Sequence, residues 1–438
     1  MKNHSLKNTS RRQFLQQGAA VTGAFVVGMH LPIASEAATA SATPALANAW
    51  IQIAPSNQIT LICARSEMGQ DVYTSLPALL AEELNLPLSM VKVEIAGVAP
   101  VYINAMLGGQ ITGGSTSVRE AFDKLRTAGA ATRSVLVQAA AQRWNVAASD
   151  CKALNGKVTH ASGKSATYGE LAADAAKLPL PEKPVLKSPA NFMVIGKETM
   201  RRLDTPAKVA GKAVYGIDVK IPGMAIASLA QCPVIGGTPK SYDASAALKV
   251  VGVIKVVQIS DGVAVLAKDF HAARKGRDAL KINWDEGPNA SLSNATVRKS
   301  LETGLSQKGA VIKAVGDVNK STSGGKAVSA QYFLPYLAHS TMEPVNCSAD
   351  VSNGKCRIIG PIQFQQGGQA VAAAAAGVKP ENVIIETTFL GGGFGRKLEL
   401  DFIRQAAEIS KVAGMPVKML WTKEDDITHD FYRPMSIH

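Results

Sequence analysis

The sequence predicts a multidomain α+β protein, and three observations support this prediction. A chain of 438 residues with 46% hydrophobic content is long enough for roughly two to four domains with buried cores. Residues 119–144 carry apolar side chains at helical spacing, whereas short segments such as 50–61 and 214–219 are typical of strands. A strand-like run at 383–389 then leads through a glycine-rich loop into another helical pattern. Helices and strands are therefore mixed along the chain.

Residues 1–40 are similar to a bacterial twin-arginine export signal. The run Arg11-Arg12-Gln13-Phe14-Leu15 precedes a moderately apolar stretch, 18–34, and small residues follow at 38–40. A histidine and a proline interrupt the stretch, whereas a spanning helix needs about 20 uninterrupted apolar residues. A basic tail with an anchoring helix is the alternative. We expect a periplasmic protein exported in the folded state, with membrane association through a partner left open.

The first domain is expected at residues 41–195. Residues 50–61 alternate like one strand, and the proline-rich run 179–184 resembles a linker. Residues 119–144 form one long predicted helix. Its apolar face comprises Phe122, Leu125, Ala128, Thr132, Val135 and Ala139, and Arg119, Arg126 and Arg133 lie elsewhere.

A second block at 196–290 mixes short strands with a helical segment at 272–280, and a third covers 291–438. The third block contains His339, a candidate metal ligand. A lone histidine before an apolar stretch is more often a hydrogen-bonded structural residue, and we favour that interpretation.

The glycine-rich loop at 390–397 reads Leu-Gly-Gly-Gly-Phe-Gly-Arg-Lys. Glycine reaches dihedral angles closed to other residues and lets a ligand approach the peptide N–H groups, which suits a bulky oxyanionic cofactor. The loop lacks the Lys-Ser/Thr ending of a P-loop and the G-x-G-x-x-G spacing of a dinucleotide site. A glycine hinge or tight turn is the alternative.

Three segments together resemble the xanthine oxidase family of molybdenum hydroxylases. Residues 391–395 are similar to its loop that places main-chain amides beside the molybdenum. Glu67-Met68-Gly69-Gln70 resembles a segment whose glutamine hydrogen-bonds the pterin cofactor, and Thr112-Gly-Gly-Ser115-Thr-Ser117 resembles a turn whose hydroxyls hold the cofactor phosphate. Gln363 matches a glutamine that hydrogen-bonds a molybdenum oxo group, although nearby glutamines leave that assignment open.

The resemblance implies a molybdopterin site in which the pterin holds the molybdenum, so no protein residue is expected to ligate the metal. Whether the cofactor carries a cytosine dinucleotide is left open. Residues 41–195 and 291–438 would be two segments of the molybdopterin-binding domain, the second incomplete, with an α/β hammerhead domain at 196–290. The implied cofactor-binding residues are Gly69, Gln70, Thr112, Ser115, Ser117, Gln363, Gly392, Gly393, Phe394, Gly395 and Arg396.

The order of the motifs departs from most of the family, because the Glu-Met-Gly-Gln segment precedes the glycine loop. This order resembles the isoquinoline 1-oxidoreductase β-subunit branch and its aldehyde-oxidising relatives. The resemblance implies oxidation of aldehydes or N-heteroaromatic compounds with water as oxygen source and an acceptor other than NAD. Electrons would leave through a separate [2Fe–2S] subunit, since the chain has neither cluster cysteines nor a flavin motif. A cytochrome c is a candidate later acceptor.

A second departure concerns catalysis. Members of the family use a glutamate base in a Gly-x-Gly-Glu setting near the C-terminus, and no such motif occurs here. We therefore expect a truncated product or a fragment whose base lies beyond His438 and which is inactive alone; the catalytic residue is unknown, and neither Glu343 nor Glu399 qualifies merely by being present. A non-catalytic cofactor- or partner-binding relative is one alternative, and an exported flavoprotein is another.

The formal net charge of +13 becomes +10 without residues 1–40, which carry four basic residues and one acidic residue. Because basic residues are scattered and no nucleic-acid motif occurs, we expect no nucleic-acid partner. Of the five cysteines, only Cys347 and Cys356 are close enough for a hairpin disulfide. Buried apolar thiols are the favoured alternative.

Overall fold

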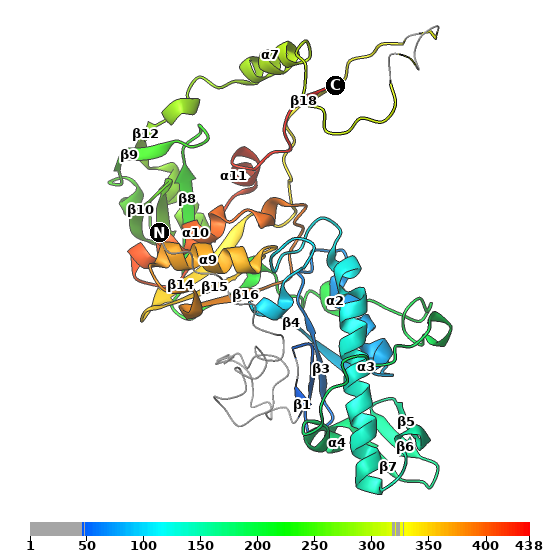
Figure 1. Cartoon of the computed structure of the whole chain (residues 1–438). Helices are drawn as coiled ribbons and strands as arrows, with labels where there is room; N and C mark the ends of the chain where they lie inside the picture. The colour runs from blue at the N-terminus through cyan, green and yellow to red at the C-terminus, as the bar shows by residue number, and fades with distance from the viewer. Residues whose placement is uncertain (1–45, 48, 318–319, 321–324, 327) are drawn as a thin grey trace, which may run out of the picture. The chain divides into compact units, whose positions relative to one another are not determined.

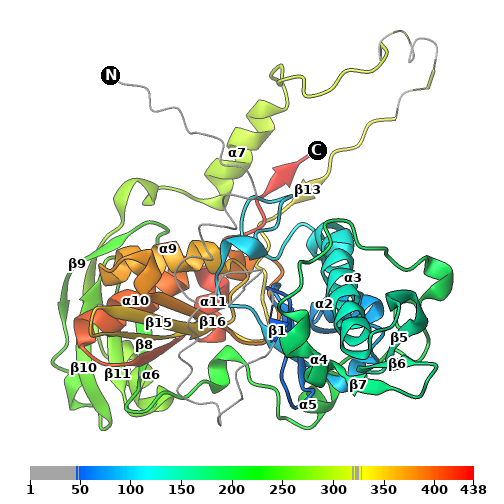
Figure 2. The same ribbon diagram turned by 60° about the horizontal axis from the view of Figure 1, so that its bottom comes forward.

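The computed structural model describes residues 46–47, 49–317, 320, 325–326 and 328–438, so the proposed export signal lies outside the described residues. The chain forms two compact units (Figures 1 and 2). The first consists of residues up to Val219 together with Arg357–Ala374 and Lys379–Gly391, and the second of Lys220–Cys356, Ala375–Val378 and Gly392–His438. Each unit is therefore assembled from segments that are distant in sequence.

The first unit combines two small sheets with long helices. Its helices are α2 (Val72–Glu83), α3 (Ser117–Trp144), α4 (Tyr168–Ala175), α5 (Thr205–Val209) and most of α9 (Gln365–Ala376). Its strands are β1 (Leu46–Ala47), β2 (Ile51–Ile53), β3 (Ile59–Cys63), β4 (Val91–Ile95), β5 (Cys151–Leu154), β6 (Lys157–His160), β7 (Ser165–Thr167), most of β15 (Lys355–Gly360) and β16 (Val383–Thr387). One sheet has the order β1-β2-β3-β4 with β3 and β4 parallel, and the other is the antiparallel sheet β5-β6-β7.

The prediction of one strand over residues 50–61 is wrong. The structure has two antiparallel strands, β2 and β3, with Ile51 opposite Leu61. Asn57, with a φ of 66°, lies in the turn between them, and its Oδ1 accepts a hydrogen bond from Gly169 N at 2.9 Å. Alternating apolar residues continue on both sides of this turn, so the pattern alone did not reveal it.

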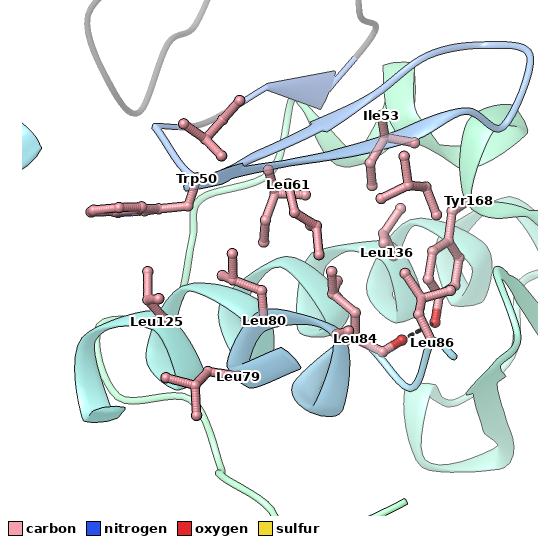
Figure 3. Close-up of a cluster of buried hydrophobic side chains, with 14 of the residues drawn as sticks. Trp50, Ile53, Leu61, Leu79, Leu80, Leu84, Leu86, Leu125, Leu136 and Tyr168 are labelled. Atoms are coloured by element: carbon pink, nitrogen blue, oxygen red, sulfur yellow. Dashed lines mark hydrogen bonds between the residues drawn. The ribbon is translucent and has the colours of Figure 1, made fainter. Parts of the chain in front are cut away.

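The core of the first unit lies between β2–β3 and the helices α2 and α3 (Figure 3). The predicted helix at 119–144 is confirmed as α3, which begins two residues earlier. Leu80, Leu84 and Leu125 are at most 1% exposed and pack below Leu61. Tyr168 is fully buried, and its hydroxyl donates to Leu84 O at 2.7 Å, which satisfies a carbonyl at the end of α2.

Arg126 is buried, although the helical pattern placed it away from the apolar face. Its Nε and Nη2 both donate to Glu83 Oε1, at 3.0 and 2.9 Å. The neighbouring Glu82 accepts from the N–H groups of residues 193–195 and pairs with Lys187. Burial raises the pKa of Glu82, but these donors together hold it below its usual value. Two buried carboxylates thus tie the segment after the predicted linker to α2.

The second unit is built on a mixed sheet. Within this unit the strands of the sheet run in the order β10-β11-β8-β17-β14, and β8 and β17 are parallel, with Ala225 opposite Val417. Its strands are β8 (Ala225–Gln231), β9 (Thr238–Asp243), β10 (Val253–Ile259), β11 (Gly262–Ala267), β12 (Lys281–Asp285), β13 (Phe333–Leu334), β14 (Asn346–Ser352), β17 (Val417–Leu420) and β18 (Ser436–Ile437). Its helices are α6 (Phe270–Asp278), α7 (Asn294–Gly304), α10 (Asp401–Ala413) and α11 (Lys423–Thr428). The strands β9 and β12 form a separate pair, as do β13 and β18.

The predicted strand, glycine loop and helix are confirmed as β16, the loop that follows it, and α10. Phe402, Ile403 and Ile409 are fully buried on one face of α10. The helix ends at Gly414, whose φ of 71° is the left-handed conformation that glycine adopts most easily.

The five cysteines are buried and unpaired, in agreement with the interpretation of buried apolar thiols. Burial raises the pKa of the Cys63 thiol to about 12 and that of Cys347 as well, so both thiols stay protonated at neutral pH. Across the described part of the chain, no helix combines the length and apolar character needed to cross a bilayer.

We expect Tyr168→Phe to lower the free energy of unfolding by about 1–3 kcal/mol, because it leaves the buried Leu84 carbonyl without its donor. Tyr332→Phe is the matched control, since Tyr332 is 65% exposed. Urea denaturation followed by circular dichroism measures both changes. An unchanged midpoint for Tyr168→Phe would contradict the structural role of this hydroxyl.

Candidate cofactor-binding site

Ser66 joins segments that are far apart in sequence. Its N–H donates to Thr112 Oγ1 at 2.8 Å, and its hydroxyl donates to Ile362 O at 2.6 Å. The same hydroxyl accepts from Gln365 Nε2 at 2.8 Å. Ser66 is fully buried, so these bonds form away from competing water. The residue directly before the Glu-Met-Gly-Gln motif therefore binds both the hydroxyl-rich turn and the Gln363 segment.

Thr112 and Gln363 are also bonded directly. Thr112 N donates to Gln363 O at 2.8 Å, and Gln363 Nε2 donates to Thr112 O at 3.1 Å. Gln363 is 2% exposed, and its buried Oε1 has no hydrogen-bond partner among the described residues. An unsatisfied buried oxygen is costly, so a bound group that donates to it would stabilise this arrangement.

Glu67 shapes the turn that carries Gly69 and Gln70. Its fully buried carboxylate accepts from the N–H groups of Gly69, Asp71 and Tyr73, at 2.8, 3.2 and 3.0 Å. Gly69 is exposed with a φ of 110°, a conformation that favours glycine. The Gln70 side chain folds back on the turn, donating to the Ser66 carbonyl and accepting from the residue 68 N–H. The motif thus presents an exposed turn on a buried anchor.

A group of charged residues supports this turn. Arg202 Nη1 donates to Gly69 O at 3.0 Å, and its Nη2 lies 3.3 Å from Glu67 Oε1. Asp204 pairs with Arg202 at 2.8 Å and with Lys208 at 2.6 Å. The hydrogen bond from Arg202 is the main cause that lowers the pKa of Asp204 to about 2. These contacts fix the carbonyl side of the turn and leave its outer surface open.

The turn at 112–117 leads directly into α3. Gly114 and Ser115 have φ values of 58° and 53°, and Ser115 is exposed. The hydroxyls of Ser115 and Ser117 form no hydrogen bonds with other described residues. The first N–H groups of a long helix carry a partial positive charge and suit an anion such as phosphate. This geometry fits the predicted role of the two serines.

The glycine loop presents its backbone amides in the second unit. The φ values of Gly392, Phe394 and Gly395 are 98°, 54° and 110°, so the strained positions are these three and not Gly393. Phe394 is 72% exposed. The N–H groups of residues 392–395 take no part in the backbone hydrogen bonds of the described chain. Four consecutive donors are therefore available to a ligand.

Arg396 anchors this loop from behind. It is fully buried, and its guanidinium binds Asp401 through two hydrogen bonds of 2.9 and 2.8 Å. Its N–H donates to Gly393 O at 2.8 Å, so neither group is open to a ligand in this structure. Burial lowers the pKa of Arg396, but the bonds to Asp401 more than offset this and raise it overall. Arg396 therefore supports the loop from behind, and the prediction that it binds the cofactor directly is not met by this arrangement.

The other ionisable residues near the loop are engaged in buried contacts. Glu343 is 7% exposed; it accepts from Lys397 Nζ at 2.8 Å and from Asn346 Nδ2 at 3.0 Å. Burial lowers the pKa of Lys397. His339 Nδ1 lies 2.9 Å from Asp430 Oδ1, which confirms the structural interpretation of this histidine. Among the described residues, no cluster of three or more His, Cys, Asp or Glu side chains could hold a metal ion.

Comparison with known proteins gives the same cofactor. Two models of a molybdopterin cofactor-binding domain match the chain, one over residues 5–221 and the other over 305–437. The chain belongs to the xanthine oxidase family of molybdenum hydroxylases. The matched regions contain all the segments that the sequence analysis assigned to the cofactor.

Two relatives within this family match most of the chain. It is 31% identical to the β subunit of isoquinoline 1-oxidoreductase of Brevundimonas diminuta over 97% of this chain and 60% of the relative. It is 31% identical to a membrane-bound aldehyde dehydrogenase [pyrroloquinoline-quinone] of Gluconacetobacter polyoxogenes over 89% of this chain and 52% of the relative. The chain thus spans about half the length of the curated relatives it matches. The aldehyde oxidoreductase structure from Desulfovibrio desulfuricans aligns with a TM-score of 0.44 and 16% identity, covering 61% of this chain and 35% of that one.

The residues of both units fit a molybdopterin. The cofactor presents phosphate and oxo oxygens that accept hydrogen bonds, and the loop amides and the N-terminus of α3 are matching donors. Its pterin ring carries N–H groups, and the unpaired Oε1 of Gln363 is a matching acceptor. The hydrogen-bonding groups of the cofactor are therefore complementary to those of the glycine loop, the start of α3 and Gln363.

Sequence reasoning missed several residues that shape the site. Ser66 was not assigned a role, although it directly precedes the Glu-Met-Gly-Gln motif, and Gln365 was only an open alternative to Gln363. Their proximity to the motifs is a signal that could have identified them. Arg202, Asp204 and Asp430 carry no such signal, because they act across gaps of many residues.

We expect Asp204→Asn to lower the free energy of unfolding by an amount that depends on pH. The folded-state pKa of about 2 lies below the usual 3.8, so Asp204 contributes stability above about pH 4 that is lost as the pH falls toward 2. At pH 6 the variant should be less stable by about 2 kcal/mol, and the gap should close near pH 2. Asp123→Asn, at an exposed position, is the control. Urea denaturation across this pH range measures both, and a constant gap would refute the ion-pair account.

Proposed function

We propose that this chain forms the molybdopterin-binding part of the large subunit of a periplasmic molybdenum hydroxylase that oxidises aldehydes or N-heteroaromatic compounds. The bound molybdenum cofactor would supply the two-electron oxidation in which water provides the oxygen atom. Support comes from the family membership and from the buried hydrogen bonds that join Ser66, Thr112 and the 362–365 segment. This last observation carries the proposal, because it brings two predicted cofactor segments together in the first unit.

The residues of the chain would bind and orient the cofactor. Gly69 and Gln70 offer an exposed turn to the pterin, and Ser115 and Ser117 would bind a phosphate at the start of α3. Gln363 would accept a hydrogen bond from a pterin N–H through its free Oε1, because its Nε2 donates to Thr112 O. The amides of residues 392–395 would donate to cofactor oxygens, with Phe394 at the exposed tip. Glu343 is committed to Lys397 and Asn346, so we assign it no proton-transfer role.

A separate [2Fe–2S] subunit would receive the electrons, and a cytochrome c is a candidate acceptor after it. The sequence supports this division of labour, because its cysteines lack the spacing of a cluster site. Residues 41–195 and 291–438 would be segments of the cofactor domain, and 196–290 a hammerhead domain. A cytosine dinucleotide form of the cofactor stays a prediction of the family resemblance.

Metal and pterin analysis of the purified chain tests this proposal. We expect molybdenum and pterin to co-purify with the parent protein, and Gly395→Ala to lower both by about tenfold, because a Cβ at a φ of 110° strains the loop. Gly354→Ala is the matched control: Gly354 also has a positive φ, of 71°, but lies in the turn between β14 and β15. The Gly354→Ala variant should be less stable than the parent but keep the same molybdenum and pterin content.

Three results would contradict the proposal. A parent protein that lacks molybdenum after expression in a cofactor-producing host would favour a non-catalytic relative. A yellow protein with a flavin spectrum would favour the dinucleotide alternative for the glycine loop. Equal cofactor loss in the two alanine variants would show that the loop makes no specific contact.

Export should depend on the arginine pair. Arg11→Lys with Arg12→Lys keeps the charge but changes the groups that a receptor recognises. We expect the precursor to accumulate in the cytoplasm, whereas Lys7→Arg, outside the pair, should be exported normally. Cell fractionation and immunoblotting measure this, and normal delivery of the double variant to the periplasm would exclude a twin-arginine signal.

A further inference from the structure

One carboxylate, that of Asp430, contacts both His339, which lies against Gly395, and Arg396, which follows Gly395 in the chain. Asp430, which follows α11, is 6% exposed. Its Oδ1 lies 2.9 Å from His339 Nδ1, and its Oδ2 accepts a hydrogen bond from His339 N at 2.5 Å. The same Oδ1 forms an ion pair with Arg396 Nε at 3.2 Å. Asp430 therefore contacts a residue from the segment before β14 and the residue directly after Gly395.

Both partners of Asp430 restrict the glycine loop. A Cβ atom placed on Gly395 would lie 3.4 Å from His339 Nε2, so the imidazole lies against this glycine. The Arg396 guanidinium stands over the rings of Trp421 and Phe431, 5.3 and 5.2 Å from their centroids. The backbone at Gly395 is thus confined by an imidazole on one side and by an anchored arginine on the next residue.

We propose that Asp430 is a positioning residue of the cofactor site. By holding His339 and Arg396 together, this clamp (Asp430, His339 and Arg396) fixes the glycine loop in the conformation that leaves the amides of residues 392–395 without partners among the described residues. This inference rests on the proposed cofactor role of the loop. A preformed row of donors costs no reordering when an oxyanion binds, and the clamp would supply that preorganisation.

The chemistry of a carboxylate is essential to this role. Asp430 accepts a hydrogen bond from the His339 main-chain N–H, lies within hydrogen-bonding distance of His339 Nδ1 and forms an ion pair with the Arg396 guanidinium. A carboxylate can accept at both oxygens. An asparagine has one accepting oxygen and one donating NH₂ group. In Asp430→Asn, the new NH₂ group therefore faces either the His339 main-chain N–H or the Arg396 guanidinium, whichever way the amide is turned, and two donors cannot bond to each other. The clamp must then open on one side.

Hydrogen–deuterium exchange on the cofactor-free chain tests the clamp independently of cofactor binding. We expect Asp430→Asn to speed the exchange of the Arg396 and Leu398 amides, which donate to Gly393 O and Gly395 O within the peptide spanning residues 390–398, by about tenfold or more. Glu83→Gln is the matched control, because Glu83 is a fully buried carboxylate that pairs with Arg126 at 2.9 Å in the first unit. Its exchange in this peptide should match the parent. Molybdenum content, measured separately, should fall only in Asp430→Asn.

A second pair of variants decides the question even if Asp430→Asn does not fold. His339→Asn retains a side-chain donor near the position of Nδ1, whereas His339→Leu has none. We expect parent-like exchange at 390–398 for the former and fast exchange for the latter. Equal exchange in these two variants, or equal exchange in Asp430→Asn and Glu83→Gln, would overturn the proposal. Fast local exchange with unchanged molybdenum content would also overturn the role in cofactor binding, while leaving the family assignment intact.

Discussion

The first unit depends on buried hydrogen bonds at two consecutive residues, Ser66 and Glu67. Ser66 binds Thr112 and the segment at 362–365, and Glu67 organises the turn before α2. Because the groups are removed from water, each bond that is lost leaves an unsatisfied polar atom. This constraint specifies one arrangement of segments separated by 46 and 296 residues. The exposed cofactor motifs can remain open because their supports are satisfied beneath them.

Buried charge serves the same purpose in both units. Glu82 and Glu83 tie the 185–195 segment to α2, and Asp401 and Asp430 hold Arg396 behind the glycine loop. A buried ion pair adds little net stability, but removing one partner is costly, so such pairs enforce a particular geometry. The pairs of Asp401 and Asp430 with Arg396 lie directly beside the glycine loop, which must stay open to a ligand. The anchored Arg396 is therefore adjacent along the chain to the unpartnered amides of residues 392–395.

Much of the local structure follows from patterns of a few residues. The periodicity of residues 119–144 predicted α3, and the glycine loop between a strand and a helix appeared where the residue types required it. The pattern failed at residues 50–61, where Pro55, Ser56 and Asn57 form a turn between two apolar strands, and at Arg126, which is buried by its bond to Glu83. The first failure is unrecognised turn chemistry, and the second is a contact distant in sequence that overrode the local signal.

The sequence by itself pointed to the cofactor class and the candidate residues through the resemblance of three segments to the xanthine oxidase family; their glycines, hydroxyls and amides are groups that an oxyanionic cofactor can bind. Only the tertiary structure decided which of these groups are open and which are supports. It left the amides at 392–395 without partners among the described residues, and it buried the guanidinium of Arg396 in ion pairs. That difference depends on partners such as Asp430, which come near the loop only when the chain folds, since no local pattern encodes a contact across 91 residues.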